Sequence, residues 1–524
     1  MEGAKIETIL LFLTFLQISS FCNSVPLSTS SSWIIDQSTG NRVKLACVNW
    51  ASHMEPMIAE GLEKKPINYI ATQIASNGFN CVRFTWATFM FTRPDYSSLT
   101  VSQSLDKYNL TAAKSGITEN NPQILNMKII DVHKAVVNEL GKNNLMVVLD
   151  NHVSMPSWCC SNDDGNGFFG DPSFDPIEWL KGLIEVARTY KGNSAVVGMS
   201  LRNELRGKRQ NVPNWYKYME QGANTIHQEN PDFLVIISGL SFDNNLSFLR
   251  RRPLNLNLNN KLVYEAHWYT FGIANWTAQT NKVCSVITKA ARNNHLFLTT
   301  GNNPFPLFLS EFGINQGGND EGENRFITCL LAEVAEKDID WALWTFQGSY
   351  MIRQGNLNVE ETYGVMDLNW DRPRNPAFLE RLQVIRQLNQ EPKSTQPTKY
   401  IIFHPQSGQC VQIDDHNKNV ILANCNNASR WDQHQDGDPI KLSGSQQYLS
   451  FAYCKDCKWK YVSSLGLQLA SRSGQGEYLC LEKNGLENRL VAKKCLCVTD
   501  NLVDYRTCAD NPQVQWFKFV PTNV

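Results

Sequence analysis

Two glutamates stand at the ends of apolar runs that lie far apart in the sequence. Glu204 ends the run AVVGMSLRNE, and Glu311 ends the run LFLSE. A carboxylate is costly to place at the end of a buried strand unless it has partners or a chemical task. Cleavage of a glycosidic bond with retention needs two carboxyl groups roughly 5 to 5.5 Å apart, one protonated and one ionised. The two glutamates are candidates for that chemistry if the fold brings them together.

Eight apolar runs are the elements that must position these residues. They cover 45–50, 80–86, 145–152, 195–204, 233–239, 262–269, 307–313 and 339–346, with helical patterns at 66–77, 124–143, 176–190, 213–229, 280–293 and 322–337. Continuous apolar strands that alternate with amphipathic helices indicate a parallel sheet covered by helices. Eight such units favour an α/β fold of the closed (β/α)8 TIM barrel type over an open doubly wound sheet.

Several of these runs end in polar or aromatic residues. In a parallel barrel the carboxyl ends of all strands meet on one face, which carries the active site. On that face we expect Arg83 and Tyr269 to bond Glu311 and to keep it ionised, so that its pKa lies below that of Glu204. Glu204, facing this charge, is favoured in its protonated form. Once Glu311 carries a sugar its charge is gone, so Glu204 loses its proton more easily and can activate water.

The region from about 45 to 385 resembles glycoside hydrolase family 5, whose members are retaining (β/α)8 enzymes. The residues that carry the resemblance follow the family's strand order: Arg83, His152 in LDNH, Asn203 with Glu204, His267 with Tyr269, Glu311 in LSEFG, and Trp344. The segments WYTFGIANWT and VVLDNHVSMPSWCC also look like secreted plant members of the family.

The resemblance implies a role for several of these side chains. It makes Glu204 the acid/base and Glu311 the nucleophile. It makes Asn203 a donor to the sugar 2-hydroxyl and Trp344 a stacking surface for the sugar. For His152 and His267 a purely structural role stays open. The mechanism requires no metal and no organic cofactor.

The N-terminus and the cysteines indicate a secreted protein, extracellular or in the cell wall. We predict that 1–24 is a signal peptide, because its apolar core is too short to span a bilayer. Of the 15 cysteines, 14 remain after its removal, six between 47 and 329 and eight between 410 and 508, and even numbers fit disulfides within domains. The glycosylation candidates are Asn109, Asn245, Asn275 and Asn427. No other stretch is a candidate membrane span.

The chain divides at a segment rich in Pro, Gln, Ser and Thr. We predict a hydrolase domain at 25–388, a linker at 389–399 and an all-β domain at 400–524. The last region resembles a ricin-B-type β-trefoil, since two cysteine pairs with a spacing of 15 are each followed by a tryptophan. The disulfide candidates there are Cys410, Cys425, Cys480, Cys495, Cys497 and Cys508, with their connectivity open. Gln412 and Glu482 replace the aspartate that binds sugar in this type, so glycan binding is an open possibility.

Other motifs and the composition argue against different functions. GNGFFG, at 165–170, does not directly join a strand to a helix, which argues against a dinucleotide site. For Cys454 and Cys457, the density of cysteines nearby favours disulfides over zinc. No G-x-S-x-G motif of an esterase occurs. With 49 Lys and Arg against 50 Asp and Glu, nucleic acid is not an expected partner.

The sequence therefore predicts an O-glycosyl hydrolase that acts on β-linked polysaccharides of the glucan or mannan type by double displacement. Its role would lie in polysaccharide catabolism or cell-wall remodelling. The alternatives are a carbohydrate-binding protein with weak or lost turnover and a transglycosylase. The sugar and the linkage depend on loops, of which 87–122 and 153–175 are the longest candidates.

Overall fold

Eight parallel strands close into a barrel in the computed structural model, which describes residues 26–270, 280–414, 419–433, 435–451, 454, 457–463, 465–485, 488–498 and 511–524. The strands are β3 (Ala46–Trp50), β4 (Cys81–Ala87), β5 (Met146–Val153), β6 (Val196–Ser200), β7 (Leu234–Ile237), β8 (Leu262–His267), β9 (Leu307–Phe312) and β10 (Asp340–Leu343). They follow one another in chain order, and β10 closes the barrel on β3. The predicted TIM barrel is confirmed.

The helices between the strands also lie where the sequence predicts them. They are α1 (Ile67–Ser76), α6 (Ile129–Lys142), α7 (Pro176–Thr189), α8 (Val212–Glu229), α10 (Thr280–Asn294) and α11 (Glu321–Lys337). The start of α7 shows the local cause, because the Asp175 side chain accepts from the backbone N–H groups of Ile177 and Glu178, and Pro176 begins the helix.

Shorter elements elaborate the barrel. The short helices are α2 (Thr88–Thr92), α3 (Pro94–Ser97), α4 (Val101–Lys107), α5 (Thr111–Asn120), α9 (Leu240–Asp243), α12 (Pro376–Arg381) and α13 (Gln383–Arg386). Two antiparallel pairs are β1 (Leu27–Ser30) with β2 (Trp33–Asp36), and β11 (Ser349–Arg353) with β12 (Asn356–Glu360). Turns of 3₁₀ helix cover Pro122–Ile124, Ser247–Arg250, Leu296–Thr299, Cys425–Asn427 and Pro512–Gln515.

The interior of the barrel changes from apolar to polar along its strands. Side chains two residues apart on a strand point to the same face. On five strands an apolar residue that points into the barrel is therefore followed, two positions later, by a buried polar residue on the same face. The pairs are Cys47 and Asn49, Cys81 and Arg83, Val148 and Asp150, Val263 and Glu265, and Phe308 and Ser310. The apolar half supports the barrel, and the polar half lies toward the carboxyl ends of the strands, where a TIM barrel carries its site.

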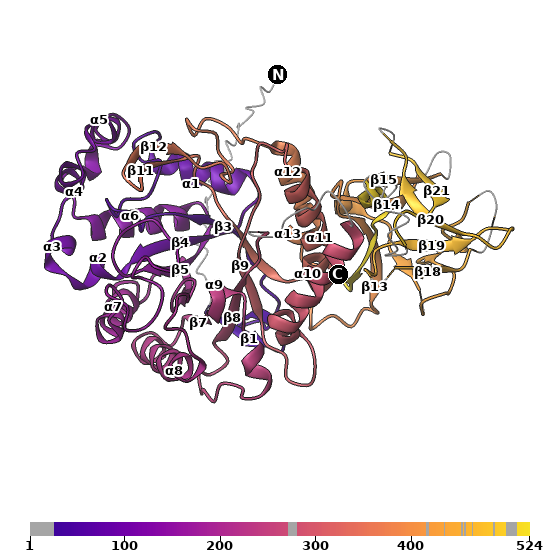
Figure 1. The fold of residues 1–524 in the computed structure, drawn as a ribbon, viewed down its shortest axis with the longest axis horizontal. Helices are drawn as coiled ribbons and strands as arrows, with labels where there is room; N and C mark the ends of the chain where they lie inside the picture. The colour runs from indigo at the N-terminus through magenta and orange to yellow at the C-terminus, as the bar shows by residue number, and fades with distance from the viewer. Residues whose placement is uncertain are drawn as a thin grey trace, which may run out of the picture.

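The C-terminal region is built of short strands in two antiparallel sheets (Figure 1). They comprise β13 (Lys399–His404), β14 (Gln409–Ile413), β15 (Val420–Ala423), β16 (Trp431–Asp432), β17 (Lys441–Leu442) and β22 (Lys518–Thr522) in one, and β18 (Trp459–Tyr461), β19 (Leu469–Arg472), β20 (Tyr478–Lys483) and β21 (Leu490–Lys494) in the other. Trp431, Trp459 and Trp516 are fully buried in this region.

Polar contacts join the C-terminal region to the barrel. The indole N–H of Trp516 donates to Oδ1 of Asn281 on α10 at 2.9 Å, and Nζ of Lys518 lies 2.9 Å from Oε2 of Glu336 on α11. The predicted linker is anchored at its start, where the backbone N–H of Asn389 donates to Asp338. The C-terminal region therefore contacts α10 and α11 through residues at and before β22.

Disulfides occur in both parts of the chain. The described pairs are Cys47–Cys81, Cys159–Cys160, Cys284–Cys329, Cys410–Cys425 and Cys480–Cys495. Cys497 is also disulfide-bonded, and Cys508 lies outside the described residues. The expectation of a disulfide at Cys457 is wrong, because this buried residue is a thiol whose Sγ lies 3.1 Å from the carbonyl oxygen of Cys454.

The glycosylation candidates differ in exposure. Asn109 and Asn427 are exposed, whereas Asn245 is half-buried and its side chain accepts from Ser247. Asn275 and the predicted signal peptide at 1–24 lie outside the described residues.

Among the described helices, none has the length and apolar content needed to cross a membrane.

Candidate active site

Arg83 lies at the centre of the polar half of the barrel and is fully buried. Its Nη1 donates to Oε1 of Glu311 at 2.8 Å and to Oδ1 of Asn49 at 3.0 Å. Its Nη2 donates to Oδ1 of Asn203 at 2.9 Å and lies 2.9 Å from Oδ1 of Asp150. One guanidinium thus holds side chains from four parts of the barrel in fixed relative positions.

The two candidate glutamates face each other across a short gap. One carboxylate oxygen of Glu204, one of Glu311 and a ring nitrogen of His267 all lie within 4.8 Å of one another. Nδ1 of His267 is 2.9 Å from Oε1 of Glu204 and 3.6 Å from Oε2 of Glu311. The hydroxyl of Tyr269 donates to Oε2 of Glu311 at 3.1 Å. The fold therefore assembles the predicted carboxyl pair.

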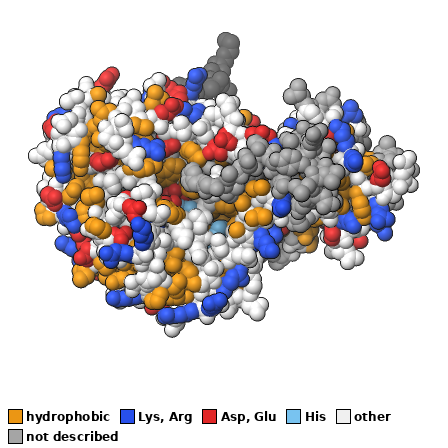
Figure 2. Space-filling view, in the orientation of Figure 1, with side chains coloured by type: hydrophobic (Ala, Val, Ile, Leu, Met, Phe, Trp, Pro, Cys, Tyr) orange, Lys and Arg blue, Asp and Glu red, His pale blue; other side chains and the backbone are white. Residues whose placement is uncertain are grey.

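The carboxyl pair of Glu204 and Glu311 is close to the surface of the barrel. Figure 2 shows histidine side chains near the centre of one barrel face, bordered by acidic and hydrophobic side chains. The side chain of Glu204 is 14% exposed and that of Glu311 is 7% exposed, so a ligand can reach them although both are largely desolvated.

Burial dominates the acidity of both glutamates. It raises the pKa of Glu204 to about 7 and the pKa of Glu311 to about 7, although Arg83 opposes both shifts. The prediction that the pKa of Glu311 lies below that of Glu204 is therefore wrong, because the cost of desolvating each charge raises both pKa values to about 7. Hydrogen bonds still distinguish the two residues, because Glu311 accepts from Arg83 and Tyr269 and is the better site for the negative charge.

The backbone of Glu204 adopts a left-handed conformation, with φ of 43°. A residue other than glycine is held in this region only when its surroundings over-determine it. Its N–H donates to Oδ2 of Asp243 at 3.0 Å, and its carbonyl accepts from Nη1 of Arg206 at 2.8 Å. Oδ2 of Asp243 also lies 3.5 Å from Nε2 of His267. Asp243 thus positions both Glu204 and the histidine beside it.

His152 contacts Asn203 and helps to hold its side chain in place. Its Nδ1 is 2.6 Å from Oδ2 of Asp150, and its Nε2 is 3.5 Å from Nδ2 of Asn203. Burial holds the pKa of His152 well below its usual value, so the ring is neutral. It stacks on Trp344 with ring centroids 5.6 Å apart and an angle of 17° between the planes. These contacts favour the positioning role that the sequence left open for His152.

Sequence reasoning gave no role in the site to several residues that belong to it. Asn49, Asp150, Asp243 and Glu265 are buried and surround Arg83 or Glu204, with Oε2 of Glu265 at 3.6 Å from Arg83. Three of them had a signal, since Asn49, Asp150 and Glu265 are polar residues inside otherwise apolar strands, on the inward face. Asp243 follows β7 by a few residues and would be found only by searching beyond the strand end.

The donor atoms of the site do not favour a metal ion. Glu204, His267 and Glu311 are close enough to ligate one. However, the Arg83 guanidinium lies 2.8 Å from Glu311 and already neutralises that carboxylate. A cation bound there would face a fixed positive charge, which argues for a carboxyl pair that handles protons.

Comparisons with known proteins agree with this geometry. A family model for cellulases of glycosyl hydrolase family 5 matches residues 38–349. A protein of Chamaecyparis obtusa described as a glycosyl hydrolase 5 family protein is 43% identical over 537 residues, which cover 98% of this chain and 96% of that protein. The major extracellular endoglucanase of Xanthomonas campestris pv. campestris is 25% identical over 363 residues, covering 66% of this chain and 68% of that one.

A solved structure shares the barrel fold. The complex of an endocellulase from Pyrococcus horikoshii with cellotetraose has a TM-score of 0.56 at 18% identity, and the match covers 69% of this chain and 99% of that chain.

Proposed function

Since the chain belongs to glycosyl hydrolase family 5, a family of retaining O-glycosyl hydrolases, we propose that it hydrolyses a β-glucan by double displacement, with Glu311 as nucleophile and Glu204 as acid/base. The observation that carries the assignment is the carboxyl pair, in which one oxygen of Glu204 and one oxygen of Glu311 lie within 4.8 Å of each other. This separation suits a retaining mechanism, because an inverting pair must stand further apart to admit a water molecule. The relative from Xanthomonas campestris pv. campestris, which is named as an endoglucanase, supports the choice of a glucan.

In the first step the carboxylate of Glu311 attacks the anomeric carbon. The bond to the leaving oxygen breaks, and Glu204 gives that oxygen its proton, so that a covalent glycosyl-enzyme forms. In the second step Glu204 takes a proton from water, and the resulting hydroxide displaces Glu311. The free sugar keeps its configuration, and both carboxyl groups return to their starting states.

The neighbouring side chains have roles that follow from their contacts. Arg83 and Tyr269 stabilise the carboxylate of Glu311 before attack, and Asn203, fixed by Arg83, presents its amide to the sugar 2-hydroxyl. Trp344 offers a stacking surface to the sugar. His267 contacts both carboxyl groups and keeps their spacing.

A panel of polysaccharides tests the substrate and the mechanism together. The protein is incubated with β-glucans and mannans, and the anomer released first is read by NMR. We expect cleavage of a β-glucan with retained configuration. Inverted product would refute double displacement, and cleavage of mannan alone would refute the glucan assignment. Binding without product would indicate a carbohydrate-binding protein, and sugar transfer at high acceptor concentration would indicate a transglycosylase.

We also propose that the protein is secreted and that its C-terminal region is a ricin-B-type trefoil. The disulfides support an oxidising compartment, and the equal spacing of Cys410–Cys425 and Cys480–Cys495 supports a repeat. The Glu482 carboxylate is engaged by Lys493 and Gln515, which argues against sugar binding at that position. N-terminal sequencing of the mature protein tests secretion, and a glycan array with the full chain and a variant truncated after the barrel tests glycan binding.

A further inference from the structure

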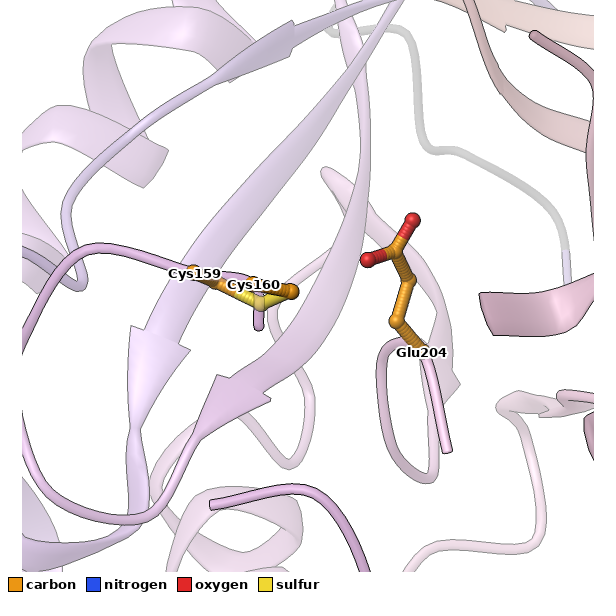
Figure 3. A group of neighbouring side chains, drawn as sticks. All are labelled: Cys159, Cys160 and Glu204. Atoms are coloured by element: carbon orange, nitrogen blue, oxygen red, sulfur yellow. A yellow bond between two sulfur atoms is a disulfide. The ribbon is translucent and has the colours of Figure 1, made fainter. Parts of the chain in front are cut away.

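A disulfide between neighbouring residues lies beside the acid/base glutamate. Cys159 and Cys160, in the loop after β5, are bonded to each other. Figure 3 shows this disulfide opposite the carboxylate of Glu204, and a sulfur of each cysteine lies within 4.8 Å of one of its oxygens. Both sulfur atoms are also 3.7 Å from Nδ2 of Asn203. Cys159 is buried and Cys160 is half-buried, so part of the disulfide is accessible.

This bond has little to contribute to the stability of the whole fold. A disulfide stabilises a protein mainly by closing a loop in the unfolded chain, and the effect grows with the length of that loop. Cys47–Cys81 and Cys284–Cys329 join residues 34 and 45 positions apart, whereas Cys159 and Cys160 are adjacent. The adjacent pair is therefore more informative for the surface that it forms beside Glu204 than for stability.

We propose that the Cys159–Cys160 disulfide is a wall of the sugar-binding site, where it contacts C–H groups of a sugar ring joined to the glycosidic oxygen that Glu204 protonates, and where it holds the Asn203 amide toward the sugar 2-hydroxyl. The inference rests on the proposed function. It assigns a substrate contact to two residues outside the carboxyl pair and its hydrogen-bonded neighbours.

Distances around Glu204 support the sugar contact. The oxygen that Glu204 protonates must lie about 2.7 Å from its carboxyl group in a hydrogen bond. The sulfur atoms are within 4.8 Å of an oxygen of the same carboxyl group. A ring carbon attached to the protonated oxygen therefore comes into van der Waals range of sulfur when the sugar lies on the side of Glu204 that faces the disulfide. Sulfur is polarisable and suits such contacts with C–H groups.

The contact between the disulfide and Asn203 helps to orient the amide of that side chain. Oδ1 of Asn203 accepts from Arg83, so its two N–H groups are aimed away from Arg83, toward Nε2 of His152 and the two sulfur atoms. Sulfur is a weak acceptor. The amide is thereby oriented without being bound tightly, and a sugar hydroxyl, which is a stronger acceptor, can take its hydrogen bond.

Both flanks of the disulfide are fixed. The ring of Trp158, which precedes it, packs edge-on against Tyr350 with centroids 5.4 Å apart and lies 3.5 Å beneath the Arg353 guanidinium. On the other side the carbonyl of Ser161 accepts from Nε of Arg206 at 2.9 Å. A wall held from both ends loses little freedom when sugar binds, which favours affinity.

Binding measurements in an inactive background test the proposal. The Glu311→Gln variant, which should bind without turnover, is titrated with a β-gluco-oligosaccharide with and without the added substitutions Cys159→Ala and Cys160→Ala. We expect Kd to rise about tenfold, as for the loss of a few well-packed contacts and one oriented hydrogen bond. The melting temperature should change little. The added pair Cys480→Ala and Cys495→Ala is the matched control, since it removes a disulfide of the C-terminal sheet and should leave Kd unaltered.

Reduction of the native disulfide is a second, independent arm. Dithiothreitol supplies two electrons and two protons to convert the disulfide into two thiols and is itself oxidised to its cyclic disulfide. Reduction should weaken oligosaccharide binding to Glu311→Gln, while the protein that also lacks both cysteines should not respond. Thiol labelling and mass spectrometry of the peptide confirm which cysteines were reduced.

The outcomes separate this inference from the proposed function. Equal Kd values with and without the disulfide, in a protein that hydrolyses β-glucan, would overturn the inference and leave the function standing. A wild-type protein that neither binds nor cleaves β-glucan would refute the function on which the inference rests.

Discussion

Nη1 of Arg83 lies 2.8 Å from Oε1 of Glu311, and both side chains are almost completely buried. The same guanidinium also holds Asn49, Asn203 and Asp150, so its planar shape matters as much as its charge. The pair joins the second strand of the barrel to the seventh and sets the position of the nucleophile.

Replacement of Arg83 by lysine should reduce kcat roughly 10²-fold, because lysine keeps the charge but cannot hold four partners at once. The measurement is steady-state kinetics on β-glucan together with thermal unfolding. Arg188→Lys is the control, since Arg188 forms an exposed pair with Glu229 and its replacement should leave kcat unaltered. An Arg83→Lys enzyme with wild-type kcat would contradict the role given to the guanidinium.

Replacement of Glu311 by glutamine should lower kcat by at least about 10³-fold on every substrate, because no other nucleophile is in place.

Glu204→Ala should instead lose more rate on polysaccharide than on aryl glycosides with good leaving groups, since only the former need an acid. The comparison requires both variants on both substrates, with circular dichroism to confirm folding. Similar losses for Glu204→Ala on the two substrates would argue against its role as the acid.

The two glutamates should make the folded protein less stable as pH rises. Burial raises their pKa from 4.5 to about 7, so the folded state binds more protons than the unfolded state between these values. Their contribution is fully present below pH 4.5 and is lost as pH rises through about 7. The free energy of unfolding, measured in urea at about pH 5 and about pH 8, should fall more in the wild type than in the Glu204→Gln, Glu311→Gln double variant. Identical changes would contradict the raised pKa values.

Asp243 should act as a positioning residue through the backbone of Glu204. Asp243→Ala removes the acceptor of the Glu204 N–H, and a displaced acid should lower kcat by about 10-fold or more with KM little changed. Asp243→Asn retains an acceptor oxygen and should recover most of the loss. If the alanine and asparagine variants are equally active, the contact with Glu204 does not position the acid.

Much of the fold could be predicted because its signals are local. The apolar runs and the helical patterns each occupy a short window, and the observed β3 to β10 and their helices lie within or beside the predicted ranges. The site residues followed from the same signal, since polar residues such as Arg83, His267 and Glu311 interrupt apolar runs near their carboxyl ends. Once the runs are placed in a parallel barrel, these ends must converge.

The sequence by itself thus determined the barrel, the carboxyl pair and the disulfide candidates that are joined within the C-terminal sheets. Only the tertiary structure decided that Glu204 and Glu311 both have a pKa of about 7, that Asp243 holds the backbone of Glu204, and that Cys159 and Cys160 face the acid. The reason is physical. A periodic pattern depends only on residues close together in the sequence. The desolvation of a carboxyl group and the contacts of a loop depend on atoms from many strands, which come together only in the folded protein.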